Sequence, residues 1–265
     1  MDISIVIVNY NTSKKTINCI NSIKESDTAD LNWEVIVVDN NSKNNDVEQI
    51  KSAHSDVKVV ENKQNVGMGA GNNVGISQAG GDFILILNPD TLIKQDAIKV
   101  MYEYIKDKKE VGIVAPKLLN PDASLQYSCL RFPRIYTPVL RRTFLGRLAK
   151  KYLNDFLMKN FDHNKTREVD WIIGSCLLLD RKLLDKTGKI FDEKYFMYFE
   201  DTDLCRRAWG QGLKVVYHPQ AKIIHDHMRE SAGKPWYISP FLDKLTREHI
   251  KSWIKYFINN KKHIK

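Results

Sequence analysis

A cluster of acidic residues beside an aromatic run is the strongest chemical signal in this sequence. Glu200, Asp201 and Asp203 come directly after residues 191–199, which include five aromatic side chains, and a helical pattern follows them. An apolar wall beside clustered carboxylates raises the pKa of one of them toward neutrality, as a general base requires at physiological pH. The acidic first turn of an ordinary helix explains the same residues without catalysis, because the helix dipole favours carboxylates there.

Two further polar features are suited to binding a metal ion. The buried-strand pattern Phe83–Leu87 ends in Asn88, Pro89 and Asp90, and a carboxylate in a proline-stiffened turn suits Mg²⁺ or Mn²⁺ bound together with phosphate oxygens. His225 ends a later extended segment, and a histidine near an Asp-bound metal is a common further ligand. Taken alone, the first feature is more often an ordinary turn, and a lone histidine is more often a structural group.

A glycine-rich stretch opens another helical pattern at residues 65–73, which read NVGMGAGNN. Glycine at a helix start lets backbone N–H groups approach phosphate or ribose, and it equally permits a tight loop with several positive φ angles. The dinucleotide fingerprint G-x-G-x-x-G fails in every register, so a nicotinamide or flavin enzyme is disfavoured.

The elements that must position these groups alternate in type along the first half of the chain. Short β-branched runs predict strands, and longer periodic segments between them predict helices, which together indicate βαβ units and a parallel sheet. The predicted strands are Ile3–Val8, Glu34–Val38, Val57–Val60 and Phe83–Leu87, and the predicted helices are Ser13–Glu25, Lys43–Ala53 and Met68–Ala79. Ligands bind at the carboxyl ends of such strands, where Asn9, Asn11, Asp39 and Asp90 stand.

The second half predicts a continuation of the sheet with no linker dividing the chain. Extended segments are predicted at Gly112–Pro116, Ser124–Ser128, Val169–Leu179 and Lys214–His225. The part from Trp171 to Leu179 is apolar enough to be a central strand.

The net charge of +9 comes from two segments that combine cations with apolar residues at helical spacing. Residues 141–165 and 239–265 each hold seven Lys or Arg against two acidic residues, while the rest is about neutral. In the second segment Phe241, Leu245, Trp253 and Phe257 lie near one stripe. This pattern fits either a helix that closes the domain or one that lies on an anionic membrane surface, and it argues against nucleic-acid binding.

Other classes are excluded by simple features. The longest uncharged apolar runs are too short to cross a bilayer, and the start MDISIVIVNY lacks the basic region of a signal peptide. We therefore expect a cytoplasmic protein, with peripheral contact at the inner face of the cell membrane if the basic segments bind lipid. Free thiols are expected rather than a zinc site or disulfides, because four dispersed cysteines show no CxxC spacing.

Taken together, seven ordered features resemble bacterial family 2 glycosyltransferases, most closely their rhamnosyltransferase-like branch. They are VNYN (8–11), VDNNS (38–42), NVGMGAGNN (65–73), LNPDT (87–91), WIIGSCLLLDR (171–181), FDEKYFMYFEDTDLCRR (191–207) and His225. The resemblance covers about residues 1–230 and implies an α/β fold of GT-A type, with a mostly parallel central sheet and helices on both faces. It also implies a nucleotide-sugar half at about 1–115 and an acceptor half at about 116–230, followed by a basic amphipathic helical segment at 231–265.

The resemblance implies a role for individual positions. The implied nucleotide-binding residues are Asn9, Asn11, Asp39, Asn65, Gly67 and Asn72. The implied metal ligands are Asp90 and His225, and the implied acceptor-binding residues are Glu200, Asp203 and Trp171. The implied catalytic base is Asp201. Asn88 stands at the first position of the family's DxD metal signature, so the ion would be coordinated by one Asp and the diphosphate. Residues 226–230 replace the family's usual glycine-rich tail, which leaves the loop over the donor without its family pattern.

The implied reaction is inverting transfer of a hexose from a dTDP- or UDP-sugar, with dTDP-L-rhamnose the best single donor, Mg²⁺ or Mn²⁺ as cofactor and a saccharide as acceptor. A polyprenyl-diphosphate-linked acceptor in cell-surface polysaccharide synthesis would suit the basic segments. A sugar-1-phosphate nucleotidyltransferase is the alternative enzyme, but it would carry a glycine- and basic-rich loop where this chain has Asn9, Tyr10 and Asn11. A non-catalytic membrane- or nucleic-acid-binding protein would explain the charge and leave the acidic cluster without a role.

Overall fold

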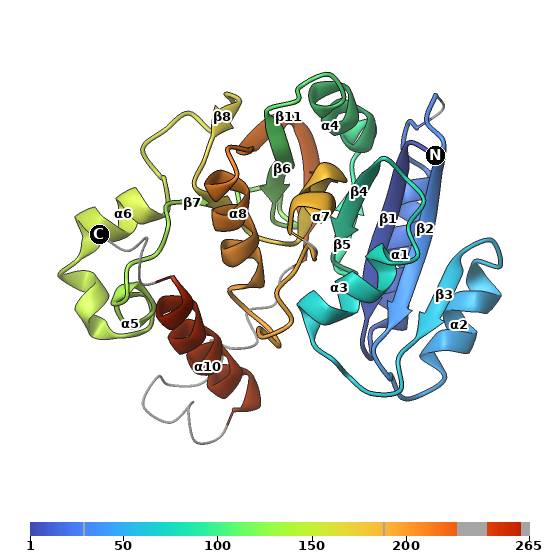
Figure 1. Cartoon of the computed structure of the whole chain (residues 1–265), viewed down its shortest axis with the longest axis horizontal. Coiled ribbons are helices and arrows are strands. Elements are labelled where there is room, and N and C mark those ends of the chain that lie inside the picture. Colours follow the sequence, from blue (N-terminus) through green and yellow to red (C-terminus); the bar gives the residue numbers. More distant parts are fainter. Residues whose placement is uncertain (29, 188, 227–242, 261–265) are drawn as a thin grey trace.

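The computed structural model describes residues 1–28, 30–187, 189–226 and 243–260, which form a central sheet with helices on both faces (Figure 1). Within these residues the central sheet contains β1 (Ile3–Asn9), β2 (Trp33–Asp39), β3 (Lys58–Glu61), β4 (Phe83–Leu87), β5 (Thr91–Ile93), β6 (Val111–Leu119), β8 (Arg167–Glu168), β10 (Cys176–Asp180) and β11 (Lys214–His225). A separate small sheet pairs β7 (Cys129–Leu130) with β9 (Trp171–Ile172).

The helices connect these strands and cover the sheet. They are α1 (Ser13–Lys24), α2 (Asp46–Ala53), α3 (Met68–Ile76), α4 (Ala97–Ile105), α5 (Thr137–Arg142), the short 3₁₀ helix η1 (Phe144–Arg147), α6 (Lys150–Phe156), α7 (Lys182–Thr187), α8 (Glu200–Gly210) and α10 (Lys244–Asn259). The cores on the two faces are distinct, because one packs against α1 and α4 and the other against α8.

The first half is a parallel βαβ arrangement, as the alternation predicts. The strands lie in the order β3-β2-β1-β4, and every pairing among them is parallel. The residues of β1 and β4 and most of those of β2 are buried, because helices cover both sides of the sheet, whereas Lys58 and Glu61 of β3 are exposed. The register pairs Asn9 with Asp39 and Ile7 with Leu87, so the polar residues that follow β1, β2 and β4 reach the same edge.

Helix α3 lies unusually close to the sheet, and its glycines allow this approach. A Cβ atom built on Gly75 would lie 2.4 Å from Val6 Cγ1, and one on Gly71 would lie 3.2 Å from Val8 Cγ1. Real side chains do not approach to the first of these distances, so Gly75 is required for helix–sheet packing, and Gly71, within residues 65–73, lies close against the same strand.

The second half is mixed, because β10 runs antiparallel between β4 and β6 while β11 runs parallel to β6. The prediction of one strand over Val169–Leu179 is wrong, since residues 173–175 break it into β9 and β10, which belong to different sheets. The strand predicted at Ser124–Ser128 is also absent from the described residues there, where only Leu125 forms an isolated bridge with Leu119. All four cysteines are buried free thiols, as expected.

Helix α10 packs on the domain through its apolar face. Tyr256 and Phe257 are buried against Tyr195 and Phe199, and the Arg206 guanidinium donates a 2.6 Å hydrogen bond to the Tyr256 hydroxyl. Of the predicted stripe, Phe257 is buried, Leu245 and Trp253 are partly buried, and Phe241 lies outside the described residues. The helix lies below α8 and beside α5 in Figure 1. This packing supports the interpretation that the segment forms a helix that closes the domain.

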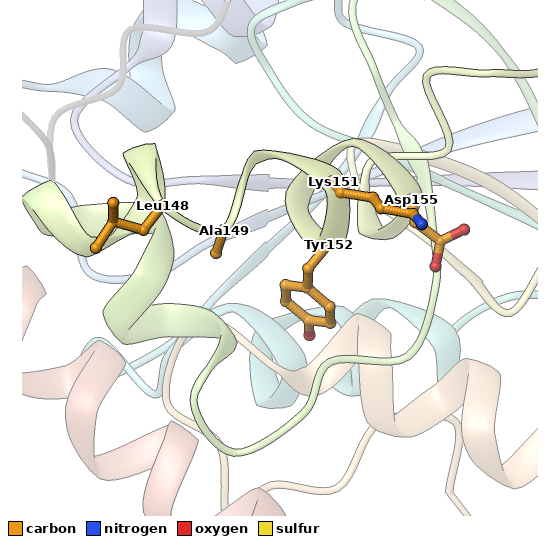
Figure 2. Close-up of a pocket in the computed structure, with 5 residues that line it drawn as sticks. All are labelled: Leu148, Ala149, Lys151, Tyr152 and Asp155. Carbon is orange, nitrogen blue, oxygen red and sulfur yellow. The ribbon is translucent and has the colours of Figure 1, made fainter.

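The basic segment at α5, η1 and α6 behaves in the opposite way, because several of its apolar residues face water, although Phe156 of α6 is buried. Phe144 and Leu148 are 65% and 86% exposed, and Ile135, Val139 and Leu145 are exposed as well. A surface pocket of about 460 Å³ on α6 is lined by Leu148, Ala149, Lys151, Tyr152 and Asp155 (Figure 2). It contains one carboxylate and lies apart from the acidic turn of α8. None of the described helices is long and apolar enough to span a membrane.

Candidate active site

The acidic turn is set by two residues in an unfavourable backbone conformation. Tyr198 and Phe199 have φ angles of 69° and 67°, in the left-handed region that L side chains rarely adopt, and α8 begins at the next residue. Such strain persists only where the surrounding structure imposes it, and it gathers at functional sites. Here it places Glu200 and Asp201 in the first turn of α8, at the base of a cavity.

Asp201 is held by backbone donors on both carboxylate oxygens. Oδ2 accepts a 2.9 Å hydrogen bond from the Gly174 N–H, and Oδ1 accepts one of 2.7 Å from the Thr202 N–H. The break between β9 and β10 supplies the first donor, because residues 173–175 leave the sheet. A Cβ at Gly174 would lie 3.2 Å from the Asp201 Cβ, so this position suits glycine. Burial raises the pKa of Asp201, against the lowering effect of these hydrogen bonds.

Glu200 is the neighbouring carboxyl, and its environment favours the protonated form. Burial and the charge of Asp201 raise the pKa of Glu200 to about 8. Its Oε2 atom is buried and accepts no hydrogen bond from the described residues. Two adjacent carboxylates that repel each other share a proton at neutral pH, so the turn holds one charged and one neutral carboxyl group.

These carboxyl groups line a cavity of about 360 Å³ that several predicted site residues share. Glu200, Asp201, Trp171 and His225 all border it. The indole N–H of Trp171 donates a 2.7 Å hydrogen bond to the carbonyl oxygen of Arg131, which fixes the ring. The remaining lining residues are Met68, Asn88, Pro133, Thr137, Pro138, Arg141, Arg142, Phe156, Ile173, Gly174, Ser175, Met197, Tyr198, Phe199, Thr202 and His249.

Asp90 and His225 lie together beside this cavity. His225 Nε2 is 3.4 Å from Asp90 Oδ1, while His225 Nδ1 lies 2.7 Å from Gln126 Oε1. Burial would raise the pKa of Asp90, but the hydrogen bond and charge of His225 outweigh it and lower the pKa. Asp90 Oδ1 is buried without a well-formed hydrogen bond from the described residues, which fits an oxygen available to a cation. No group of three or more His, Cys, Asp or Glu side chains in the described ranges could hold a metal.

Asn9 and Asp39 meet at the strand ends, but Asn9 is an internal bridge. Its buried amide donates to Asp39 Oδ1 at 2.8 Å, to Ser42 Oγ at 3.0 Å and to Asp46 Oδ2 at 3.1 Å. The Ser42 N–H donates to Asp39 Oδ2 at 2.8 Å, so both oxygens of Asp39 are oriented. The geometry supports Asn9 as a residue that positions Asp39 rather than one that contacts a nucleotide itself.

The other predicted nucleotide-binding residues take different environments. Asn11 is exposed with φ of 56°, and its side-chain oxygen accepts a hydrogen bond from the Lys43 N–H. Asn65 caps the Gly67 N–H at 2.9 Å, and Asn72 is buried in α3. A Cβ on Gly67 would lie 2.2 Å from the Phe196 carbonyl oxygen. Gly67 therefore serves the contact between α3 and the segment before α8, and none of these residues borders the 360 Å³ cavity.

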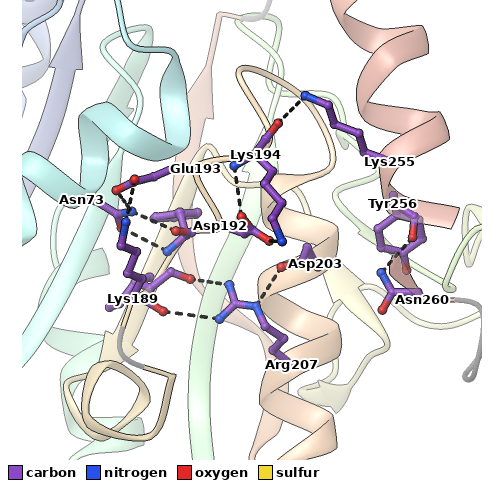
Figure 3. Close-up of polar contacts among 12 residues, drawn as sticks. Asn73, Lys189, Asp192, Glu193, Lys194, Asp203, Arg207, Lys255, Tyr256 and Asn260 are labelled. Carbon is purple, nitrogen blue, oxygen red and sulfur yellow. Dashed lines mark hydrogen bonds and ion pairs between the residues drawn. The ribbon is translucent and has the colours of Figure 1, made fainter. Parts of the chain in front are cut away.

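Asp203 is directed away from the cavity and into an ion pair. Its Oδ2 accepts a 2.8 Å hydrogen bond from Arg207 Nε, and Arg207 also donates to the carbonyl oxygens of Lys189 and Ile190 (Figure 3). Asp203 is buried and is not among the residues that border the cavity. Its geometry gives no support to acceptor binding and indicates that it anchors the preceding loop to α8.

Several residues at the site were not assigned a role from the sequence. Ser42, Gly174, Arg141, Arg142 and His249 contact or border the groups described above. Ser42 and Gly174 stand inside motifs that the sequence did single out, VDNNS and WIIGSCLLLDR. No local pattern marks the other three, because they come from the basic insertion and from α10.

The fold and the site together are those of a glycosyltransferase of the GT-A type. The parallel first half ends in polar groups at one sheet edge, and an acidic helix start borders a cavity in the second half. Residues 4–188 match the family described as glycosyl transferase family 2. The chain belongs to this family and is a glycosyltransferase.

Relatives agree with this class, and a solved structure agrees with the fold. The N-acetylglucosaminyl-diphospho-decaprenol L-rhamnosyltransferase of Mycobacterium tuberculosis is 27% identical over 213 residues, covering 76% of this chain and 68% of the relative. The dTDP-rhamnosyl transferase RfbF of Shigella flexneri is 25% identical over 227 residues, covering 83% and 67%. The mannosyltransferase PcManGT of Pyrobaculum calidifontis, solved with GDP-Man and Mn²⁺, is 18% identical with a TM-score of 0.64, covering 97% of this chain and 64% of that chain. The chain thus spans about two thirds of these proteins.

Proposed function

We propose that this chain is an inverting transferase that moves L-rhamnose from dTDP-L-rhamnose to a hydroxyl group of a saccharide acceptor. The observation that carries the proposal is the single cavity in which the carboxyl pair Glu200 and Asp201 meets Trp171 and His225. Relatives of this chain are named as rhamnosyltransferases, which supports rhamnose as the sugar. A UDP-hexose is the competing donor.

The carboxyl pair performs the proton transfer in this proposal. Asp201 accepts the proton of the acceptor hydroxyl, and the hydroxyl oxygen then bonds to the anomeric carbon as the bond to the nucleotide diphosphate breaks. Inversion needs one carboxylate base at the reacting centre and no enzyme nucleophile. Glu200 is the neutral carboxyl group of the pair at pH 7, while the Gly174 and Thr202 N–H groups keep Asp201 oriented.

Asp90 and His225 would hold a divalent cation, Mg²⁺ or Mn²⁺, together with oxygens of the diphosphate. Their 3.4 Å separation and the buried Oδ1 atom of Asp90 support this assignment. A cation bound there supplies positive charge that stabilises the leaving diphosphate. Two protein ligands bind a hard cation weakly, so affinity for the ion should rise when the nucleotide is present.

The test compares two neighbouring acidic residues. Asp201→Asn should lower the rate of rhamnose transfer about 100-fold or more, the range for loss of a general base, while donor affinity stays unchanged. Asp203→Asn is the matched control, because it breaks the ion pair with Arg207 and should cost about 2 kcal/mol of stability with most of the transfer rate retained. Near wild-type turnover by Asp201→Asn would refute the assignment of the base.

The acceptor in this proposal is a polyprenyl-diphosphate-linked saccharide at the inner face of the cell membrane, used in cell-surface polysaccharide synthesis. One relative is named for a diphospho-decaprenol acceptor. The basic segment at α5, η1 and α6 supports the location, because Phe144 and Leu148 are exposed among cations. Apolar side chains that enter the headgroup region and cations that attract anionic lipid are the features of a peripheral membrane surface.

A further inference from the structure

The cavity has a basic wall opposite in charge to its acidic turn. Arg141 and Arg142 at the end of α5 and His249 of α10 border the same space as Glu200 and Asp201. Arg141 is exposed and lies with its guanidinium carbon 5.6 Å from the Phe156 ring centroid, whereas Arg142 is partly buried. We call Arg141, Arg142 and His249 the arginine wall.

The electrostatics of this wall favour an anion. Burial lowers the pKa of Arg142, against the opposing effects of Tyr198 and Asp243. Burial, followed by the charges of Arg142 and Arg141, lowers the pKa of His249 to about 3. His249 is therefore neutral at physiological pH, and both arginine charges act at its position. A guanidinium pair at the edge of an apolar cavity binds phosphate oxygens by charge-assisted hydrogen bonds.

We propose that the arginine wall binds the phosphate groups of an acceptor whose sugar is joined to a lipid through a phosphate or diphosphate link. The inference rests on the proposed function and adds the residues that select this class of acceptor. The sugar would lie between the wall and the acidic turn, beside Trp171. The lipid would leave over the exposed apolar residues of α5 and η1, which include Val139 and Phe144.

The alternative occupant of the wall is the diphosphate of the donor. Two observations favour the acceptor. The arginine wall comes from the basic insertion and from α10, whereas Asp39 and Asp90 follow the strands of the nucleotide half. The arginine wall also adjoins the exposed apolar surface of α5 and η1. A lipid-linked acceptor would contact that surface, whereas a soluble donor would not need it. Because donor and acceptor have separate Michaelis constants, the two occupants can be distinguished by kinetics.

The experiment uses two acceptors that differ in one link. One is N-acetylglucosamine joined to a short alkyl chain by diphosphate, and the other is the same sugar as an alkyl glycoside. The full chain should prefer the first by at least about tenfold in kcat/KM, since charge-assisted contacts of this kind exceed one power of ten. Arg141→Gln and Arg142→Gln should each lose most of that preference and leave the donor KM unchanged. Arg147→Gln is the control, because Arg147 is an exposed cation of η1 that does not border the cavity.

Each outcome bears on the inference separately from the proposed function. No preference for the diphosphate acceptor in the wild type, or a raised donor KM in the arginine variants, overturns the inference while transfer itself stands. If Arg142→Gln lowers the melting temperature, Arg142→Lys is measured in its place, because it retains the charge. A partial preference for the diphosphate-linked acceptor is then expected. If the wild type transfers to neither acceptor, the proposed function fails. Calorimetric binding of alkyl diphosphate then tests the wall directly, and equal affinity in wild type and Arg141→Gln overturns the inference.

Discussion

Replacing Glu200 with Gln should make the protein more stable, and increasingly so as pH rises. Glutamine has nearly the shape of protonated glutamate but never ionises. The pKa of Glu200 is raised from 4.5 to about 8 by burial and by the charge of Asp201. Between these pH values the unfolded chain ionises Glu200 freely while the folded protein must keep the proton, so wild-type stability falls as pH rises from about 4.5 to 8.

The size of the effect follows from the pKa difference. Each pKa unit corresponds to about 1.4 kcal/mol, so the gap between 4.5 and about 8 sets an upper limit of about 5 kcal/mol above pH 8. Glu200 borders the cavity, and solvent screening there reduces the value. We expect Glu200→Gln to be stabilising by roughly 2 kcal/mol at pH 9 and by little at pH 5. Loss of the Glu200 charge also relieves Asp201, which acts in the same direction.

Urea unfolding at pH 5, 7 and 9 measures this difference in the free energy of unfolding. Glu25→Gln is the matched control, because it removes the same charge from an exposed carboxylate at the end of α1. Transfer by Glu200→Gln at pH 7 should stay well above that of Asp201→Asn, since Gln reproduces the neutral hydrogen-bond donor. A stability difference that is the same at pH 5 and pH 9 would refute the reasoning that Glu200 is held protonated.

Three further outcomes follow from the structure. Asp90→Ala should weaken Mn²⁺ binding in the presence of nucleotide diphosphate and leave metal-free nucleotide binding unchanged by calorimetry; full wild-type activity in excess chelator would contradict the metal assignment. Gly67→Ala should cost at least about 2 kcal/mol in urea unfolding, because its φ is 91° and its Cβ would overlap a carbonyl oxygen, whereas Gly210→Ala, with open space around it, should stabilise slightly. Phe144→Asp should reduce salt-sensitive binding to anionic vesicles more than Ile258→Asp in α10 does, and equal effects would remove η1 from the membrane contact.

The central strands could be predicted from the sequence because burial on both faces leaves a local trace. Phe83–Leu87 has the predicted bounds, and β1 and β2 extend only slightly beyond theirs. Lys214–His225 also has its predicted bounds, although part of it alternates between buried and exposed residues. The break within Val169–Leu179 could not be predicted in this way. At the break the Gly174 N–H donates to Asp201, a residue 27 positions later, and residues 173 and 175 bond to Ser128 and Asn88, and hydrophobic periodicity carries no information about such partners.

The site residues show the same limit. The type and position of Asn9 predict a ligand contact, and the structure adds that its amide bridges Asp39 and Asp46, which lie 30 and 37 residues away and which no local pattern indicates. The ion pair of Asp203 could have been predicted from the sequence, because Arg207 stands four residues later on the same helix, which is the spacing of an ion pair. The acidic cluster thus combined one structural carboxylate with the two that reach the cavity.

The two basic amphipathic segments show why composition alone does not decide exposure. Both have cations and apolar residues at helical spacing, and the sequence left both roles open for each. The aromatic run before α8 resolves the choice for α10, because Tyr195 and Phe199 offer it a buried apolar surface. The other segment exposes Phe144 and Leu148 to water. A tertiary partner therefore separates the structural helix from the candidate lipid surface.

The segment before α8 connects three parts of the site through the backbone. The Met68 N–H, at the start of α3, donates a 2.8 Å hydrogen bond to the Phe196 carbonyl oxygen, and Asn73 of the same helix bonds the backbone of Phe191. Ser252 of α10 donates to the Met197 carbonyl oxygen. The strained turn that starts α8 is therefore fixed from α3 on one side and from α10 on the other. These backbone bonds join the glycine-rich start of α3, the turn that carries Glu200 and Asp201, and α10 into one hydrogen-bonded unit.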